Sequence, residues 1–198
     1  MQQAIEKANQ AIHDTAARSP AYEGMGTTIV VATFNGGRFN VGHVGDSRLY
    51  RLRDGNLEQL TTDHSLSHEL IAKGYFQNVE EVAAAGLKNA ITRALGLDTA
   101  VQVDLMENAV QADDIYLLCS DGLTDMVPDP QIQSILADHG ADLKPAVDKL
   151  IEVAKQNGGR DNISVILVRP LAVKTRPAIT TWPRRLIRWF GNFFATGE

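Results

Sequence analysis

The chain has 198 residues, of which 44% are hydrophobic and 22% charged, enough to bury one core of ordinary size. No apolar stretch reaches 18 residues and no secretory leader is visible, so we expect a soluble, cytoplasmic protein. A formal net charge of -5 argues against nucleic acid as a partner.

The first third of the chain predicts one helix followed by strands. Residues 3–17 carry apolar side chains at helical spacing. Four β-rich runs follow in two pairs, residues 27–34 with 38–44 and residues 49–53 with 57–60. Each pair is joined by a turn sequence typical of a tight hairpin, Asn35-Gly36-Gly37 and Asp54-Gly55-Asn56. We therefore expect a meander of short antiparallel strands.

The remainder changes period several times. Helical spacing in residues 65–95, interrupted at Gly74 and Gly86, predicts a helical insertion. Further strands are expected at residues 101–107, 115–119 and 163–168, and helices at residues 132–136 and from a cap at Asp142 to Gly158. Because strands and helices come in blocks, the order favours an α+β fold of antiparallel sheets flanked by helices, with one domain over residues 1–170.

Three aspartates lie at the ends of strand-like runs. Asp46 and Asp121 each follow such a run, and Asp161 precedes one. If the last two strands are antiparallel neighbours, the end of one lies beside the start of the other. Carboxylate oxygens suit Mg²⁺ or Mn²⁺, and two such ions can activate water for phosphate-ester hydrolysis. Taken singly, each aspartate is more often a turn residue.

Six motifs occur in a fixed order along the chain. They are Gly26-Thr27-Thr28, Val44-Gly45-Asp46-Ser47-Arg48-Leu49-Tyr50, Thr62-Asp63-His64-Ser65, Ile91-Thr92-Arg93-Ala94-Leu95-Gly96, Leu118-Cys119-Ser120-Asp121-Gly122-Leu123-Thr124-Asp125 and Gly158-Gly159-Arg160-Asp161-Asn162-Ile163-Ser164. Together they resemble the metal-dependent serine/threonine protein phosphatase family (PPM, type 2C) in its bacterial form. An ordered series is far more specific than any single motif.

The resemblance implies both a fold and a chemistry. The fold is an antiparallel β-sandwich of two sheets flanked by helices, in four layers (αββα). Asp121 and Asp161 match ligands of a core site for two Mn²⁺ or Mg²⁺ ions, and Asp46 matches a contributor to a weaker third site. A metal-bridging water then attacks the phosphorus of phosphoserine or phosphothreonine. The implied partners are phosphoproteins, with a bacterial serine/threonine kinase or its substrates.

The family pattern also includes motifs that precede the opening helix and that this sequence lacks. They are an Asp or Glu on the first strands, an Asp-Gly-x-Gly-Gly loop and a phosphate-binding Arg. Glu23-Gly24-Met25-Gly26 imitates the loop, but we assign it to the Gly-Thr-Thr motif. We therefore expect an N-terminally truncated domain. The alternative function is a catalytically impaired relative that binds phosphoproteins or a kinase.

Other reactive residues have simpler interpretations. Cys119 lacks the arginine that a cysteine phosphatase loop needs, which favours a small buried hydrophobe. His64 and His68 lack the glutamate of a metalloprotease motif, so we expect packing or surface roles. For Arg48 we expect an ion pair with a nearby acid, and for Asp63 a capping or turn role.

Residues 171–198 form a basic, aromatic tail. Between residues 181 and 194 it mixes tryptophan, phenylalanine and leucine with three arginines. Such a segment can lie on an anionic membrane surface or dock on a protein partner. The other possibility is that it packs on an apolar patch of its own domain.

Overall fold

The computed structural model describes residues 1–87, 90–139 and 142–170. The helices are α1 (Gln2–Ala17), η1 (Pro20–Tyr22, a 3-10 turn), α2 (Leu66–Ala72), α3 (Val79–Ala84), α4 (Asp121–Thr124), α5 (Asp129–His139) and α6 (Leu143–Gln156). The strands are β1 (Ile29–Asn35), β2 (Arg38–Val44), β3 (Arg48–Arg53), β4 (Asn56–Gln59), β5 (Asp104–Ala109), β6 (Ile115–Cys119) and β7 (Val165–Val168). The expected tail lies outside the described residues.

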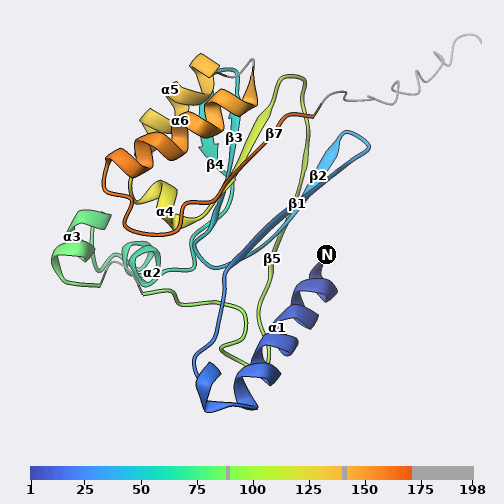
Figure 1. Cartoon of the computed structure of the whole chain (residues 1–198), viewed down its shortest axis with the longest axis vertical. Helices are drawn as coiled ribbons and strands as arrows, with labels where there is room; N and C mark the ends of the chain where they lie inside the picture. The colour runs from blue at the N-terminus through green and yellow to red at the C-terminus, as the bar shows by residue number, and fades with distance from the viewer. Residues whose placement is uncertain (88–89, 140–141, 171–198) are drawn as a thin grey trace, which may run out of the picture.

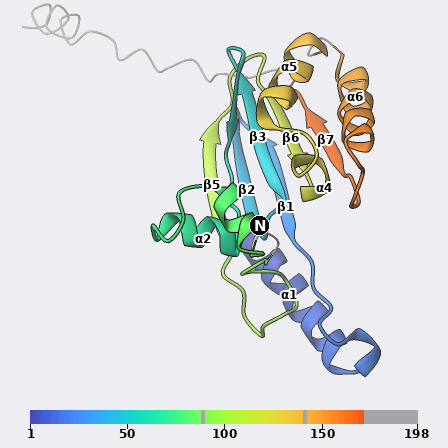
Figure 2. The same ribbon diagram turned by 90° about the vertical axis from the view of Figure 1, so that its left-hand side faces the viewer.

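Two antiparallel sheets pack face to face, with helices on both outer sides (Figures 1 and 2). One sheet has the strand order β1-β2-β5 and the other β4-β3-β6-β7. The core between the sheets is built around Phe39, Val41, Leu49 and Tyr116, all of them buried. The expected α+β sandwich is therefore confirmed.

Each outer sheet face has its own apolar cluster. Helices α5 and α6 cover the four-stranded sheet with residues such as Ile132, Leu136 and Leu150, which are completely buried. Helix α1 covers part of the three-stranded sheet through Ile5, which packs with Val44. The layers therefore follow the order helix, sheet, sheet, helix.

The two hairpins form as predicted, but they do not make a meander. In the first, Gly36 and Gly37 have φ of 59° and 78°, the left-handed values that a two-residue hairpin turn requires. The expectation that β2 and β3 pair was wrong, because β2 lies in one sheet and β3 in the other. Strand β2 is buried on both faces over much of its length, so its pairing depends on distant strands rather than on the next turn.

The insertion between the hairpins and β5 consists of the short helices α2 and α3. Ser65 and Asn78 cap their N-termini. Gly74 and Gly86, where the sequence predicts interruptions, follow the helix ends with positive φ. Strand β5 begins at Asp104, three residues later than expected, and the short helix α4 was not predicted. Within the described residues, no helix is both long and apolar enough to cross a membrane.

Candidate metal centre

One polar cavity of about 720 Å³ contains the side chains of all three predicted metal ligands. Asp46 comes from the loop after β2, Asp121 from the first turn of α4, and Asp161 from the loop before β7. The lining also includes three further aspartates, Asp63, Asp125 and Asp129, with Arg48 as its single arginine. Six carboxylates facing one arginine make the cavity a strongly anionic site.

The pairing of β6 with β7 brings Asp121 and Asp161 to the same end of the sheet. The strands are antiparallel, with Cys119 opposite Val165. Just beyond them, the Ser120 hydroxyl donates to the Asn162 carbonyl at 2.8 Å and accepts from the Ser164 backbone N–H at 3.0 Å. Gly122 completes this junction, because any Cβ there would overlap the Asn162 carbonyl oxygen.

The aspartate carboxylates of this cavity influence one another. Burial raises the pKa of Asp46, and the negative charge of Asp121 adds to the effect. Burial also raises the pKa of Asp121, and the charges of Asp161 and Asp125 act in the same direction. Like charges that are held close and partly out of water are stabilised by a cation.

The donor set fits a hard divalent ion. Every acidic side chain in the cavity is an aspartate, and the carboxylate oxygen is the ligand that Mg²⁺ and Mn²⁺ prefer. Within the described residues, the oxygens of Asp46, Asp121 and Asp161 do not all lie within 4.8 Å of one another. The three carboxylates line one site without forming a closed ligand cage.

Arg48 forms the expected ion pair. Its guanidinium donates to both Asp63 oxygens, at 2.9 Å from Nε and 2.7 Å from Nη2, and to the Tyr50 hydroxyl at 2.9 Å. Gln59 donates a further hydrogen bond to Asp63, and the Tyr50 hydroxyl donates to Asp129. Asp63 is therefore an ion-pair partner, and the expectation of a capping or turn role for it was wrong.

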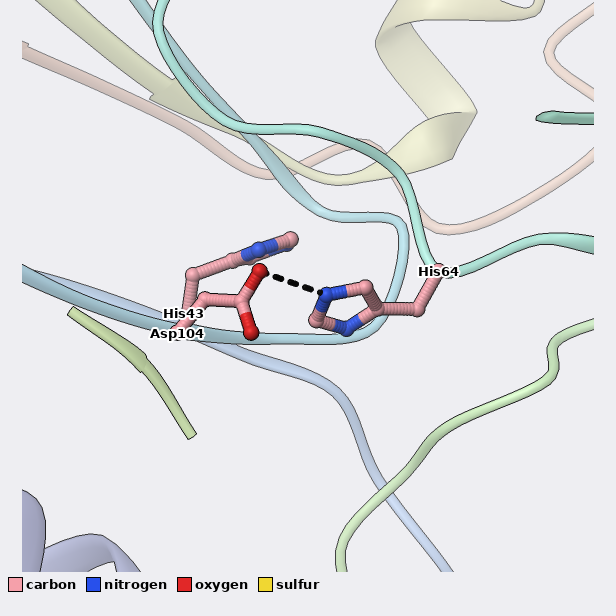
Figure 3. A group of neighbouring side chains, drawn as sticks. All are labelled: His43, His64 and Asp104. Carbon is pink, nitrogen blue, oxygen red and sulfur yellow. Dashed lines mark hydrogen bonds and ion pairs between the residues drawn. The ribbon is translucent and has the colours of Figure 1, made fainter. Parts of the chain in front are cut away.

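A second cluster of ligating side chains lies beside the cavity and was not predicted. His43 on β2, His64 and Asp104 on β5 bring one ligand atom each to within 4.8 Å of the others (Figure 3). His64 is buried, in agreement with a packing role, but no local pattern in the sequence connects it to His43 or Asp104. The three residues belong to segments far apart in the chain.

Two minor predictions agree with the structure. Cys119 is buried within β6, and burial raises the pKa of its thiol to about 12, so it is chemically inert near neutral pH. Glu23 and Gly24 line a separate hollow beside α1, away from the aspartates, which agrees with assigning them to the segment that leads into β1.

Comparison with known proteins gives a consistent result. A family model described as protein phosphatase 2C matches residues 1–168. The serine/threonine phosphatase stp of Listeria welshimeri is 41% identical over 175 residues, which cover 88% of this chain and 69% of the relative.

Solved structures agree in fold as well as in sequence. The S. agalactiae serine/threonine phosphatase aligns with a TM-score of 0.77 at 37% identity, covering 82% of this chain and 66% of that one. The catalytic domain of PstP, in complex with two manganese ions, aligns with a TM-score of 0.74 at 37% identity, covering 83% and 67%. The present chain thus spans about two thirds of the length of these relatives. The resemblance carried by the six motifs is confirmed, and the chain belongs to the protein phosphatase 2C family of metal-dependent serine/threonine phosphatases.

Proposed function

We propose that this chain carries the phosphatase chemistry of its family, with Mn²⁺ or Mg²⁺ held by Asp121, Asp161 and Asp46. The observation that supports this most is the convergence of the three motif aspartates on one anionic cavity. Manganese is the metal in the PstP structure. Asp121 and Asp161 would serve two core ions, and Asp46 a third, weaker one.

The bound ions would supply charge stabilisation for the phosphoryl oxygens and would acidify a water near neutral pH. The rest of the chemistry depends on how the chain holds its carboxylates. The β6–β7 junction fixes Asp121 relative to Asp161 through Ser120. The Arg48–Asp63 pair forms one wall of the cavity, and its guanidinium is already engaged by a carboxylate. We therefore assign Arg48 to the architecture of the site rather than to phosphate binding.

The substrates that we propose are proteins phosphorylated on serine or threonine. Besides the aspartates, the lining of the cavity includes Ser65 and His68 at the start of α2, two polar residues that an incoming phosphoprotein could contact. A bacterial serine/threonine kinase or its substrates are the proposed partners. A cytoplasmic location remains a prediction of the sequence.

We propose residues 1–170 as the catalytic portion of this chain and residues 171–198 as an accessory tail that contacts a membrane or a protein. Deleting residues 177–198 should then abolish co-sedimentation with anionic liposomes or capture by a phosphoprotein partner while leaving hydrolysis of a small aryl phosphate unchanged. Unchanged co-sedimentation and capture would contradict a binding role for the tail.

The proposed function is tested by following hydrolysis of a small aryl phosphate and of a phosphothreonine peptide while Mn²⁺ is titrated. We expect activity that needs Mn²⁺ and that Asp121→Asn or Asp161→Asn abolishes. Asp138→Asn, on the exposed face of α5, is the matched control and should behave like the wild type. Activity that survives Asp121→Asn would refute the proposed site. A chain that binds the phosphopeptide without hydrolysing it would support the alternative of an impaired binding module.

A further inference from the structure

The His43, His64 and Asp104 cluster has the composition of a zinc site, but its hydrogen bonds argue against one. The Nδ1 atom of His64 accepts the Gly45 backbone N–H at 3.0 Å. An imidazole must carry a proton on at least one nitrogen, so the proton of His64 lies on Nε2. That N–H faces the Asp104 Oδ2 at 3.1 Å and donates to it (Figure 3).

A metal ion would need the same Nε2 lone pair. Metal-bound histidines normally donate a hydrogen bond from their second nitrogen, whereas Nδ1 of His64 is an acceptor. In addition, the Arg93 guanidinium lies 3.0 Å from Nε2 and donates to Asp104 Oδ1 at 2.8 Å. A fixed positive charge therefore already occupies the position next to the nitrogen that a cation would use.

The environment of the His64 ring fixes its orientation. The His43 ring packs on it with centroids 4.7 Å apart, and His43 is itself only 2% exposed. Asp104 lies directly opposite His43 in the β2–β5 register, so both contacts of His64 originate from one rigid pair of strands. The ring is thus held on one face by His43 and at one edge by Asp104.

The other edge of His64 holds the loop that carries Asp46. Gly45 and His64 form two hydrogen bonds, from Gly45 N–H to Nδ1 and from the His64 backbone N–H to the Gly45 carbonyl at 2.8 Å. Gly45 has φ of 113°, a conformation that other residues adopt at considerable cost. The loop therefore depends on these contacts to keep its shape immediately before Asp46.

We propose that His64 is a positioning residue for the metal centre: anchored by Asp104, which Arg93 holds in turn, it clamps Gly45 and so sets the direction of the Asp46 carboxylate. This inference rests on the proposed function only in taking Asp46 as a metal ligand. It assigns to His64 no contact with substrate and no proton transfer. The effect on metal binding passes through the backbone of Gly45.

Two substitutions distinguish the Gly45 contact at one edge of the His64 ring from the Asp104 contact at the other. In His64→Asn the amide oxygen lies near the position of Nδ1 and can still accept the Gly45 N–H, while the contact with Asp104 is lost. In His64→Gln the amide reaches the position of Nε2 and can still meet Asp104, but the buried Gly45 N–H loses its acceptor. His139→Gln, at the exposed end of α5, is the matched control.

The measurement is Mn²⁺ binding to the full chain, followed by the electron paramagnetic resonance signal of the free ion, with urea unfolding to confirm the fold. We expect His64→Gln to lower the Mn²⁺ affinity of the weakest site by about tenfold, which is typical when a residue that orients a metal ligand is replaced. His64→Asn and the control should stay within about twofold of the wild type, which corresponds to less than half a kcal/mol. Combining His64→Gln with Asp46→Asn should add nothing to Asp46→Asn alone.

Several results would overturn the inference. They are a folded His64→Gln variant with wild-type Mn²⁺ binding, an equal loss in His64→Asn, additive losses in the double variant, and stoichiometric Zn²⁺ binding that His43→Phe removes. If His64→Gln does not fold, Mn²⁺ binding by His64→Asn decides: binding within about twofold of the wild type supports the Gly45 clamp, and a larger loss overturns it. A wild-type chain that binds no Mn²⁺ overturns both proposals. Mn²⁺ binding without hydrolysis overturns the proposed function alone.

Discussion

Replacing Gly45 by alanine tests how tightly the loop before Asp46 is built. An added Cβ would lie 2.5 Å from the Thr28 Cβ and would overlap the Thr28 methyl group. Thr28 cannot simply rotate away, because its Cβ is fixed to the backbone and its hydroxyl is 2.8 Å from the Ser47 hydroxyl. The substitution therefore forces the loop and the segment leading into β1 apart.

Two costs contribute to the expected loss of stability. Positive φ costs a residue with a side chain about 1–2 kcal/mol, and overpacking of this kind typically adds about 1–3 kcal/mol. Alanine also lowers the conformational entropy of the unfolded chain, which stabilises the fold by about 0.5 kcal/mol. The net expectation is a destabilisation of about 3 kcal/mol, which is a large share of the about 5–15 kcal/mol that holds a typical domain.

Urea unfolding followed by circular dichroism measures this loss. With a slope of about 2 kcal/mol per molar urea, Gly45→Ala should lower the midpoint by about 1.5 M. Gly55→Ala is the matched control, because Gly55 has φ of 77° but no atom within 4 Å of the added Cβ, so it should lose only about 1 kcal/mol. Equal losses in the two variants would refute the argument from the Thr28 contact.

Charge and burial elsewhere lead to three further expectations. Asp121→Asn should raise the urea midpoint near neutral pH even though it abolishes hydrolysis. Because the pKa of Asp121 is higher in the folded than in the unfolded chain, its ionisation destabilises the fold as pH rises through the folded value. An unchanged or lower midpoint would contradict this. Asp114→Asn should cost about 3 kcal/mol, since it breaks the ion pair with Arg53. Burial alone would raise the pKa of Asp114, but the hydrogen bonds that Arg53, Gln111 and Tyr116 donate to its carboxylate outweigh burial, so the net pKa is lowered. The stabilisation that ionised Asp114 gives the fold should be complete above about pH 4 and should vanish as pH falls through the lowered pKa of Asp114 in the folded chain. Urea midpoints that do not change with acid would refute this. Cys119 should react with iodoacetamide at pH 8 only after unfolding, and rapid labelling of the native protein would show that its pKa is not raised to about 12.

Local signals in the sequence were sufficient wherever neighbouring residues decide the structure. The hairpin at Gly36 and Gly37 follows from the positive φ that the turn needs, and α6 begins at its Asp142 cap because that side chain accepts the Lys144 backbone N–H. The same applies to the three aspartates, whose positions at strand ends were evident from the apolar runs beside them. A convergent site was therefore predictable once β6 and β7 were taken as neighbours.

The three-dimensional arrangement decided what depends on segments far apart in the chain. Whether β2 pairs with β3 or with β5 is set by burial on both faces of β2, and a two-residue turn carries no information about it. Asp63 meets Arg48 once β3 and β4 have paired, and His64, in the segment after β4, meets Asp104 on β5 only after the two sheets have packed. The sequence by itself determined the chemical type of the site, an oxygen-ligand centre for divalent cations. Only the tertiary structure determined which side chains orient its ligands, because those contacts join residues that are far apart in the chain.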